Sequence, residues 1–294
     1  MKSPAATKTA QEWRLAPRIE LTPLDAEAAA SNLAELAGHA GEAGLGRLVA
    51  FLKGRGAAQR FLAAVLDLSE FMRDSARRQP EMLDRLFDQS VDERLRSIGE
   101  AIAATPREAD VTEAYLMMRL RKLKSEAHFL IALADLAGEA DASETVHRLS
   151  SLADLCTGAA IDFLLRDAHR QGKLHLPDPE VPAAGSGWII LGMGKLGARE
   201  LNFSSDIDLV VFFDPEASAV ADPHEATDLF SRLTRRLVRI LQDRTEHGYV
   251  FRTDLRLRPD PGSTPLAISI HAALHYYESR GQNWERAAMI KARP

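Results

Sequence analysis

The sequence predicts an α+β protein in which an N-terminal α-helical region precedes a domain of mixed strands and helices. Apolar residues recur at helical spacing through the first part of the chain, whereas short apolar and alternating runs, typical of strands, appear in the last third. A group of prolines and glycines separates these two compositions. We therefore expect a flexible arm over 1–23, an α-helical region over 24–176, a linker over 177–187 and the mixed domain over 188–294.

The composition limits the classes of function that the chain can have. Its 294 residues carry a net charge of −5, so the chain has no general attraction for nucleic acid or a membrane surface, and any polyanion site must be local. No apolar run approaches the length of a membrane span. The single cysteine, Cys156, cannot form an intrachain disulfide and suits a reducing compartment. These features predict a cytoplasmic protein without nucleic-acid or membrane partners.

Two long helices are predicted in the α-helical region. Thr105-Pro106 is typical of a helix start. Asp141 is a typical N-cap residue and predicts a second helix that runs to Arg170. The first helix has an apolar stripe of Leu116, Leu120, Leu123, Ala127, Leu130 and Ala134. Four basic residues between 119 and 124 lie largely off this stripe, so we expect them on a solvated face.

The mixed domain is predicted to contain three strands and three helices. The strands are expected over Trp188–Leu191, Asp206–Phe213 and Tyr249–Arg258. The helices are expected over His224–Asp243, His271–Arg280 and Trp284–Arg293. The third strand is assigned from strict alternation of apolar and charged residues, which indicates one buried and one exposed face.

A glycine-rich turn follows the first expected strand. Gly192, Gly194 and Gly197 match the G-x-G-x-x-G pattern of dinucleotide-binding proteins. Only residues 198–205 separate the last glycine from the next strand, which is room for about two helical turns and too little for a βαβ crossover. A compact strand–turn–helix–strand unit fits better, with glycines that let backbone N–H groups approach a phosphate. A dinucleotide-binding oxidoreductase stays open as a more distant alternative.

Two carboxylates lie two residues apart at the start of the second expected strand. Asp206 and Asp208 share one face of it, because successive side chains of a strand alternate. Neighbouring like charges are unfavourable unless a cation lies between them, and Mg²⁺ is bound by one or two carboxylates together with substrate phosphates. Exposed strand-end carboxylates are the alternative, but the strand context and the preceding glycine turn favour a metal site.

A third carboxylate, Asp254, stands alone in a row of arginines in the third expected strand. Beside Asp206 and Asp208 it would complete a two-metal site. Arg256 and Arg258 would then hold phosphate oxygens through paired N–H donors. A salt-bridge ladder on the surface is the alternative for this row, and such ladders contribute little stability.

Three long segments resemble the glutamine synthetase adenylyltransferase family: Gly192–Leu209, Phe251–Pro259 and Trp284–Pro294. Together with the preceding helices, the resemblance covers most of the chain. It implies a polymerase-β-like nucleotidyltransferase domain with a small mixed sheet. Leu201–Asp208 and Trp284–Arg286 resemble the N-terminal module of that family, which removes AMP from glutamine synthetase by phosphorolysis and releases ADP.

The resemblance implies a set of ligands and partners. Two Mg²⁺ ions would be held by the catalytic carboxylates of Asp206, Asp208 and Asp254. The residues implied to contact nucleotide or phosphate are Gly192, Gly194, Lys195, Ser205, Arg256 and Arg258. ATP or ADP and inorganic phosphate would be substrates or products. Glutamine synthetase would be the protein partner, and a PII-type signalling protein would act through the full-length enzyme.

Two alternatives stay close to this hypothesis. One is the reverse chemistry, in which ATP is used to attach AMP to glutamine synthetase. The other is a regulatory fragment that binds glutamine synthetase without turnover. Chains of this family continue beyond the position of Pro294, so we expect the sequence to be part of a longer bifunctional enzyme.

Overall fold

The computed structural model describes residues 12–294, and they form two compact units. The first comprises the described residues up to Ser97 together with Glu126–Ala142, and the second comprises Ile98–Ser125 together with Ser143–Pro294. The boundaries fall inside helices α6 (Val91–Ala104) and α7 (Glu113–Leu136). No helix within residues 12–294 is long and apolar enough to cross a membrane.

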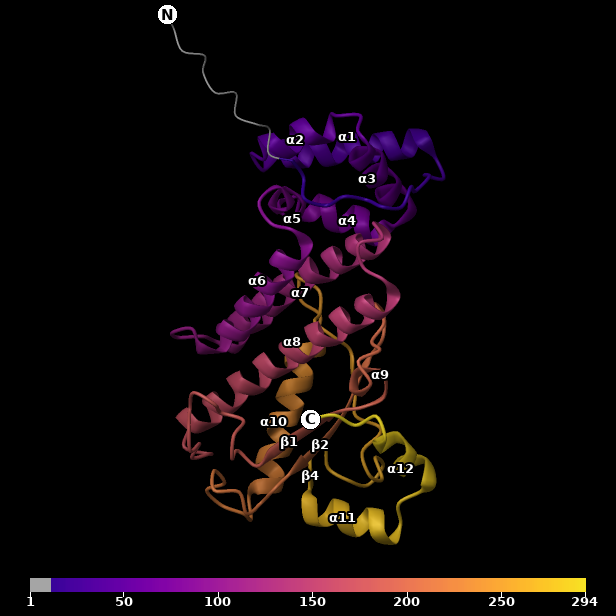
Figure 1. Cartoon of the computed structure of the whole chain (residues 1–294). Coiled ribbons are helices and arrows are strands. Elements are labelled where there is room, and N and C mark those ends of the chain that lie inside the picture. Colours follow the sequence, from indigo (N-terminus) through magenta and orange to yellow (C-terminus); the bar gives the residue numbers. More distant parts are fainter. Residues whose placement is uncertain (1–11) are drawn as a thin grey trace, which may run out of the picture. The chain divides into compact units, whose positions relative to one another are not determined.

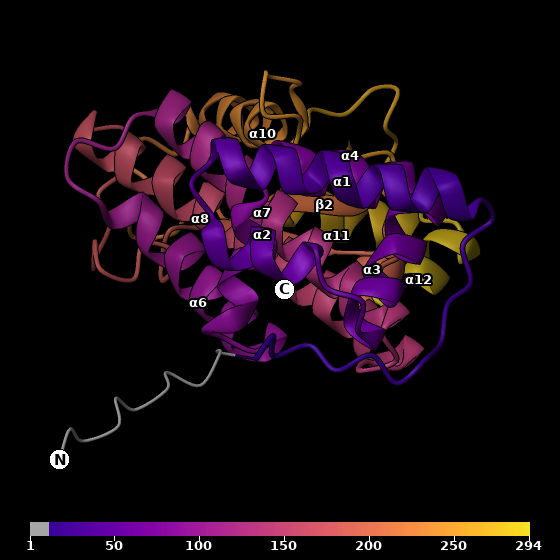
Figure 2. The same cartoon turned by 90° about the horizontal axis from the view of Figure 1, so that it is seen from above.

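The first unit is built from short helices around α1. They are α1 (Ala26–Glu42), α2 (Gly46–Leu52), α3 (Ala57–Leu68), α4 (Glu70–Arg78), α5 (Glu81–Asp84) and the 3₁₀ turn η1 (Arg85–Phe87). Helix α1 packs against α2, α3 and α4 (Figure 1 and Figure 2). Of the arm expected over 1–23, residues 1–11 lie outside the described residues. In the remainder Leu15 is buried, and the indole N–H of Trp13 donates to the carbonyl of Leu83 at 3.1 Å.

The second unit combines helices with a small sheet, so the α+β class is confirmed (Figure 1). Besides parts of α6 and α7, its helices are the 3₁₀ turn η2 (Thr105–Arg107), α8 (Ala142–Arg170), α9 (Gly194–Gly197), α10 (Ala226–Gln242), α11 (Ile270–Ser279) and α12 (Asn283–Met289). Its strands are β1 (Trp188–Gly192), β2 (Ile207–Phe213), β3 (Thr253–Asp254) and β4 (Ile268–Ser269). Helix α8, placed by the sequence in a separate helical region, thus belongs to the same unit as the sheet.

The sheet is centred on β2. Strand β1 pairs with it antiparallel from Trp188 opposite Phe213 to Gly192 opposite Leu209. On the opposite edge, β3 pairs parallel with the start of β2 and β4 pairs parallel with its end. A dinucleotide-binding βαβ unit needs parallel strands around its glycine turn. The antiparallel pairing of β1 and β2 therefore rules out the oxidoreductase alternative.

Helix α10 packs against β2 and β3, and α11 packs against β2 and β4. The apolar stripe predicted for α7 is confirmed, because all six of its residues are buried. The predicted start of that helix at Thr105 is wrong. Thr105 lies in η2, and its hydroxyl donates to the carbonyl of Ala101 in α6. Helix α7 begins at Glu113, where the Thr112 hydroxyl accepts the N–H of Tyr115.

The long third strand expected over Tyr249–Arg258 is also wrong, because only Thr253–Asp254 pair with β2. Val250 and Phe251 are both buried, so the alternation does not correspond to two strand faces. After β3 the Asp254 carboxylate accepts the backbone N–H of Arg256 at 2.8 Å, which turns the chain away from the sheet. The last expected helix ends early, at Met289.

Candidate functional site

Three predicted carboxylates meet at the start of β2. The parallel register places Asp208 opposite Asp254, and Asp206 lies immediately before the strand. Burial raises the pKa of the Asp208 carboxyl, and the charges of Asp254 and Asp206 raise it further, while Lys195 opposes the shift. The strand register thus concentrates negative charge at one end of β2.

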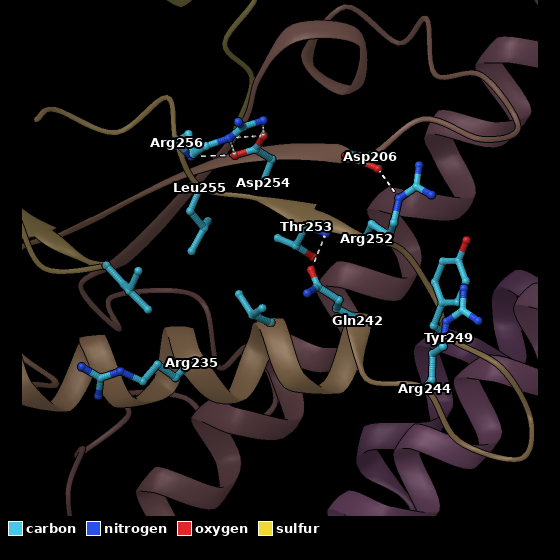
Figure 3. Close-up of a pocket in the computed structure, with 12 residues that line it drawn as sticks. Asp206, Arg235, Gln242, Arg244, Tyr249, Arg252, Thr253, Asp254, Leu255 and Arg256 are labelled. Atoms are coloured by element: carbon cyan, nitrogen blue, oxygen red, sulfur yellow. Dashed lines mark hydrogen bonds and ion pairs between the residues drawn. The ribbon is translucent and has the colours of Figure 1, made fainter. Parts of the chain in front are cut away.

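Two of these carboxylates are held by arginines (Figure 3). The guanidinium of Arg256 donates to both oxygens of Asp254, from Nε to Oδ1 at 3.1 Å and from Nη2 to Oδ2 at 2.6 Å. These hydrogen bonds lower the pKa of Asp254. Arg252 donates through Nε to Asp206 and through Nη2 to the carbonyl of Ser204 at 2.7 Å. The Arg252 pair connects the start of β2 to the segment that contains β3, whereas the Arg256 pair lies within that segment.

The Asp208 carboxylate, by contrast, has no hydrogen-bond or ion-pair partner within residues 12–294. A Cβ atom at Gly194 would lie 2.8 Å from its Oδ2, so the glycine turn approaches this carboxylate closely. Gly194 also has a φ of +52°, a left-handed backbone conformation that residues with a Cβ rarely adopt, so the conformation as well as the close approach favours glycine. The peptide N–H of Met193 donates to the carbonyl of Asp208 at 2.8 Å and fixes the turn against β2.

This donor set fits a divalent cation. Within the described part of the chain, no three or more His, Cys, Asp or Glu side chains form a group that could hold a metal ion. Mg²⁺ does not require one, because it is bound by one or two carboxylates together with substrate phosphates. Asp208 has free carboxylate oxygens, and its raised pKa indicates negative potential that a cation would relieve.

The remaining predicted contacts fall into two groups. Lys195 is exposed beside the carboxylates, and Ser205 lies in the turn before β2. The N–H of Gly192 donates to the carbonyl of Arg293 at 2.7 Å, so it is not available to a phosphate. Arg258 donates to the carbonyls of Leu255 and Pro261, so its guanidinium is committed to the turn after β3.

The glycine pattern has a packing role that the sequence did not indicate. A Cβ atom at Gly197 would lie 1.8 Å from the carbonyl oxygen of Lys291 and 2.5 Å from that of Gly192. Gly192 and Arg293 exchange two backbone hydrogen bonds, and the Arg293 guanidinium donates to Asp154 at 2.9 Å. The close approach of residues 291–293 therefore requires glycine at position 197.

A cavity of about 740 Å³ opens between α10 and the segment around β3 (Figure 3). Its lining residues are Asp206, Arg235, Val238, Gln242, Arg244, Tyr249, Arg252, Thr253, Asp254, Leu255, Arg256 and Leu266. The Gln242 side chain accepts the N–H of Thr253 at 3.0 Å, which joins α10 to β3 at this wall. The cavity therefore adjoins two of the three carboxylates.

Helix α7 supports the segment that leads into this cavity. Arg121 is 1% exposed and donates to the carbonyls of Gly248, at 2.9 Å, and Asp243. The Lys124 ammonium lies 5.6 Å from the ring centre of Tyr249, and burial lowers its pKa to about 8. The prediction of a solvated basic face is wrong for Arg121, because spacing within one helix does not reveal a distant loop that offers carbonyl acceptors.

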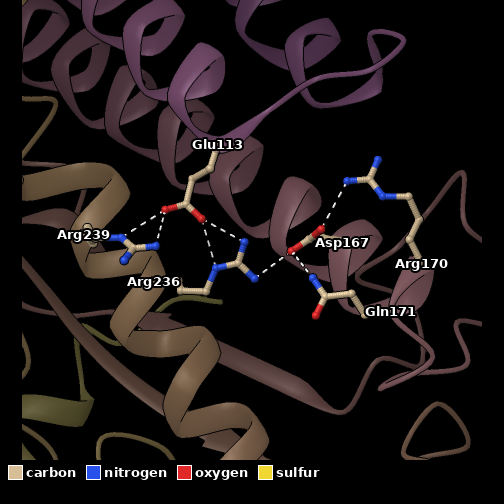
Figure 4. Close-up of polar contacts among 6 residues, drawn as sticks. All are labelled: Glu113, Asp167, Arg170, Gln171, Arg236 and Arg239. Atoms are coloured by element: carbon tan, nitrogen blue, oxygen red, sulfur yellow. Dashed lines mark hydrogen bonds and ion pairs between the residues drawn. The ribbon is translucent and has the colours of Figure 1, made fainter.

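Helix α10 is anchored by a network of charges (Figure 4). The Glu113 carboxylate on α7 accepts two hydrogen bonds from Arg236, at 2.8 and 3.0 Å, and further bonds from Arg239. Arg236 also pairs with Asp167 of α8 at 2.7 Å. Hydrogen bonds from several donors outweigh the effect of burial and lower the pKa of Asp167. In the sequence, nothing distinguishes these residues from ordinary charged residues on a helix surface.

A small mixed sheet with carboxylates at one strand end, beside a tight glycine turn, is a site of nucleotidyltransferase type. Comparison with known proteins agrees. The profile of the glutamate-ammonia ligase adenylyltransferase family matches residues 59–294, and the chain belongs to this family.

Curated relatives of the chain carry the name bifunctional glutamine synthetase adenylyltransferase/adenylyl-removing enzyme. The protein from Mesorhizobium japonicum is 69% identical over 289 residues, which are 98% of this chain and 29% of the relative. The protein from Brucella suis is 60% identical over 93% of this chain and 28% of the relative. The protein from Bradyrhizobium diazoefficiens is 48% identical over 80% of this chain and 24% of the relative. The chain thus spans less than a third of these relatives.

Proposed function

We propose that this chain removes AMP from adenylylated glutamine synthetase by phosphorolysis and releases ADP. The observation that carries the proposal is the meeting of Asp206, Asp208 and Asp254 at one end of β2. The name of the relatives, which includes an adenylyl-removing enzyme, supports it. So does the resemblance of Leu201–Asp208 to the removing module.

The proposed reaction is an in-line displacement at the phosphorus of the AMP group. An oxygen of inorganic phosphate forms a bond to that phosphorus, and the bond between phosphorus and the tyrosine oxygen breaks. The AMP group thereby becomes ADP, and the tyrosine oxygen leaves as phenolate and takes up a proton. Charge builds on both the attacking and the leaving oxygens, so stabilisation of this charge dominates the catalysis.

The three carboxylates would hold two Mg²⁺ ions, whose charge would stabilise the attacking and leaving oxygens. Gly194 lets the Asp208 carboxylate lie directly against the backbone of the glycine turn, since a Cβ there would stand 2.8 Å from Oδ2. Lys195, exposed next to Gly194, would pair with a phosphoryl oxygen.

The decisive assay is phosphate-dependent release of ADP from adenylylated glutamine synthetase, with and without Mg²⁺. We expect release that requires both, and we expect Asp206→Asn to abolish it while the circular dichroism spectrum stays unchanged. Asp228→Asn, an exposed carboxylate on α10 outside the site, is the matched control and should keep full activity. Unchanged turnover in Asp206→Asn would refute the assignment.

Attachment of AMP from ATP is the second candidate, because the name of the relatives includes that activity as well. Incorporation of AMP into unmodified glutamine synthetase, without release of ADP from the modified form, would favour it. Binding of glutamine synthetase without turnover in either assay would favour a regulatory fragment. The PII-type signalling protein is proposed as a partner of the full-length enzyme, and the cytoplasm as the place of action.

A further inference from the structure

The cavity beside the carboxylates has an excess of positive charge. Its volume of about 740 Å³ is within the range of small-molecule sites. Arg235 and Arg244 line it and have no carboxylate partner within residues 12–294. The guanidinium of Arg244 lies 5.4 Å from the ring centre of Tyr249, a contact that leaves its N–H donors available to a ligand. Arginine is suited to bidentate recognition of phosphate, so the lining favours a phosphate-bearing anion.

Two further arginines of the lining are paired with the carboxylates of the site. Arg252 binds Asp206, and Arg256 binds Asp254. The arginine side chains are 53% and 84% exposed, respectively, and the pair with Asp206 is an exposed ion pair that contributes little stability. The Asp254 side chain is only 16% exposed, so it needs another cation when Arg256 leaves. Each pair can therefore be opened at small cost if both partners acquire new ligands.

We propose that the cavity binds a phosphate-bearing anion and that Arg252 and Arg256 exchange partners when it does. A divalent cation would take the carboxylates of Asp206 and Asp254, and the two released arginines would bind the anion together with Arg235 and Arg244. Cation and anion would therefore bind cooperatively. The inference rests on the proposed function, because that function identifies the carboxylates as cation ligands.

The test is calorimetric titration of the 294-residue chain with inorganic phosphate, with and without saturating Mg²⁺. We expect Mg²⁺ to tighten phosphate binding by about fivefold or more, and phosphate to tighten Mg²⁺ binding by the same factor. In the double variant Arg252→Gln/Arg256→Gln, the factor by which each ligand tightens the binding of the other should fall to about one. Mg²⁺ alone should bind this variant more tightly than the unaltered chain, because the arginines no longer compete for the carboxylates. Both arginines are exposed, so the variant is expected to fold.

Arg232→Gln is the matched control, because Arg232 is an exposed arginine of α10 that does not line the cavity. It should keep the full cooperativity. If the double variant keeps it too, the anion is held by the cation and not by the released arginines, and the inference fails while the proposed function stands. Absence of Mg²⁺ binding would instead remove the carboxylate site on which both proposals rest. Each result is independent of turnover.

Discussion

The two edges of β2 are held by different kinds of contact. On the β1 edge, five residue pairs form a continuous backbone ladder, and residues 291–293 close against the glycine turn that follows it. On the β3 edge, β3 and β4 each form only two residue pairs with β2, and the ion pair of the exposed Arg252 with Asp206 supplements those of β3.

The difference separates a rigid edge from an adaptable one. Backbone hydrogen bonds and close packing allow only one arrangement of the β1 edge. This arrangement positions Asp208 beside Gly194. On the β3 edge the backbone pairing is short and is supplemented by side-chain contacts, which can change partners without unfolding the sheet. The cavity and its arginines lie on this second edge, where ligand binding can alter the contacts.

The largest expected effect tests the rigid edge. Gly197→Ala would place a Cβ atom 1.8 Å from the carbonyl oxygen of Lys291, so the backbone of one segment must move. We expect a loss of about 3 kcal/mol in the free energy of unfolding, measured with urea. Gly158→Ala is the control, since a Cβ there meets nothing within 4 Å, and it should stabilise α8 by about 0.5–1 kcal/mol. A Gly197→Ala variant as stable as the unaltered chain would show that residues 291–293 do not pack here.

The next effect concerns the support of the adaptable edge. Arg121→Met leaves the carbonyls of Gly248 and Asp243 without their buried donor, which should cost about 2 kcal/mol. Hydrogen exchange of the amides between 245 and 248 should accelerate, as mass spectrometry can measure. The exposed neighbour Lys122→Met should change stability by less than about 0.5 kcal/mol. Unchanged exchange in Arg121→Met would mean that other contacts fix this loop.

A smaller effect of opposite sign is expected at Asp208. Its folded pKa lies above the unfolded value, so ionisation of this carboxyl disfavours the folded state. Asp208→Asn should therefore raise the free energy of unfolding by roughly 0.5 kcal/mol at pH 7, the cost of like-charged neighbours across strands. The gain is full above the raised pKa and vanishes as pH falls below the ordinary value of 3.8. Urea titrations at pH 7 and pH 3 measure it, and a gain that persists at the lower pH would argue against a charge effect.

The smallest effect on stability is expected for Arg252→Gln. The side chain is exposed and its ion pair with Asp206 is screened by water, so the urea midpoint should stay within experimental scatter. A loss comparable to that of Arg121→Met would mean that the ion pair holds β3 in place. The two edges would then differ less than their contacts suggest.

Sequence patterns predicted the helices α7, α8, α10, α11 and α12 and the first two strands, because each of these elements has a recurring apolar pattern. The stripe on α7 and the bounds of α8 are examples. The third strand was overestimated because alternation in 249–258 was taken for sheet pairing, whereas the Asp254 turn ends the strand after two residues. The start of α7 was misplaced because Thr105 is used within η2.

The sequence by itself determined that Asp206 and Asp208 lie together, because they are two residues apart at a strand start, and that Asp254 stands among arginines. Only the tertiary structure decided which arginine binds which carboxylate, that Arg121 is buried, and that residues 291–293 require glycine at position 197. Local patterns report which side of one element is apolar. Contacts between residues 48 to 127 positions apart depend on how the elements pack, and no single segment contains that information.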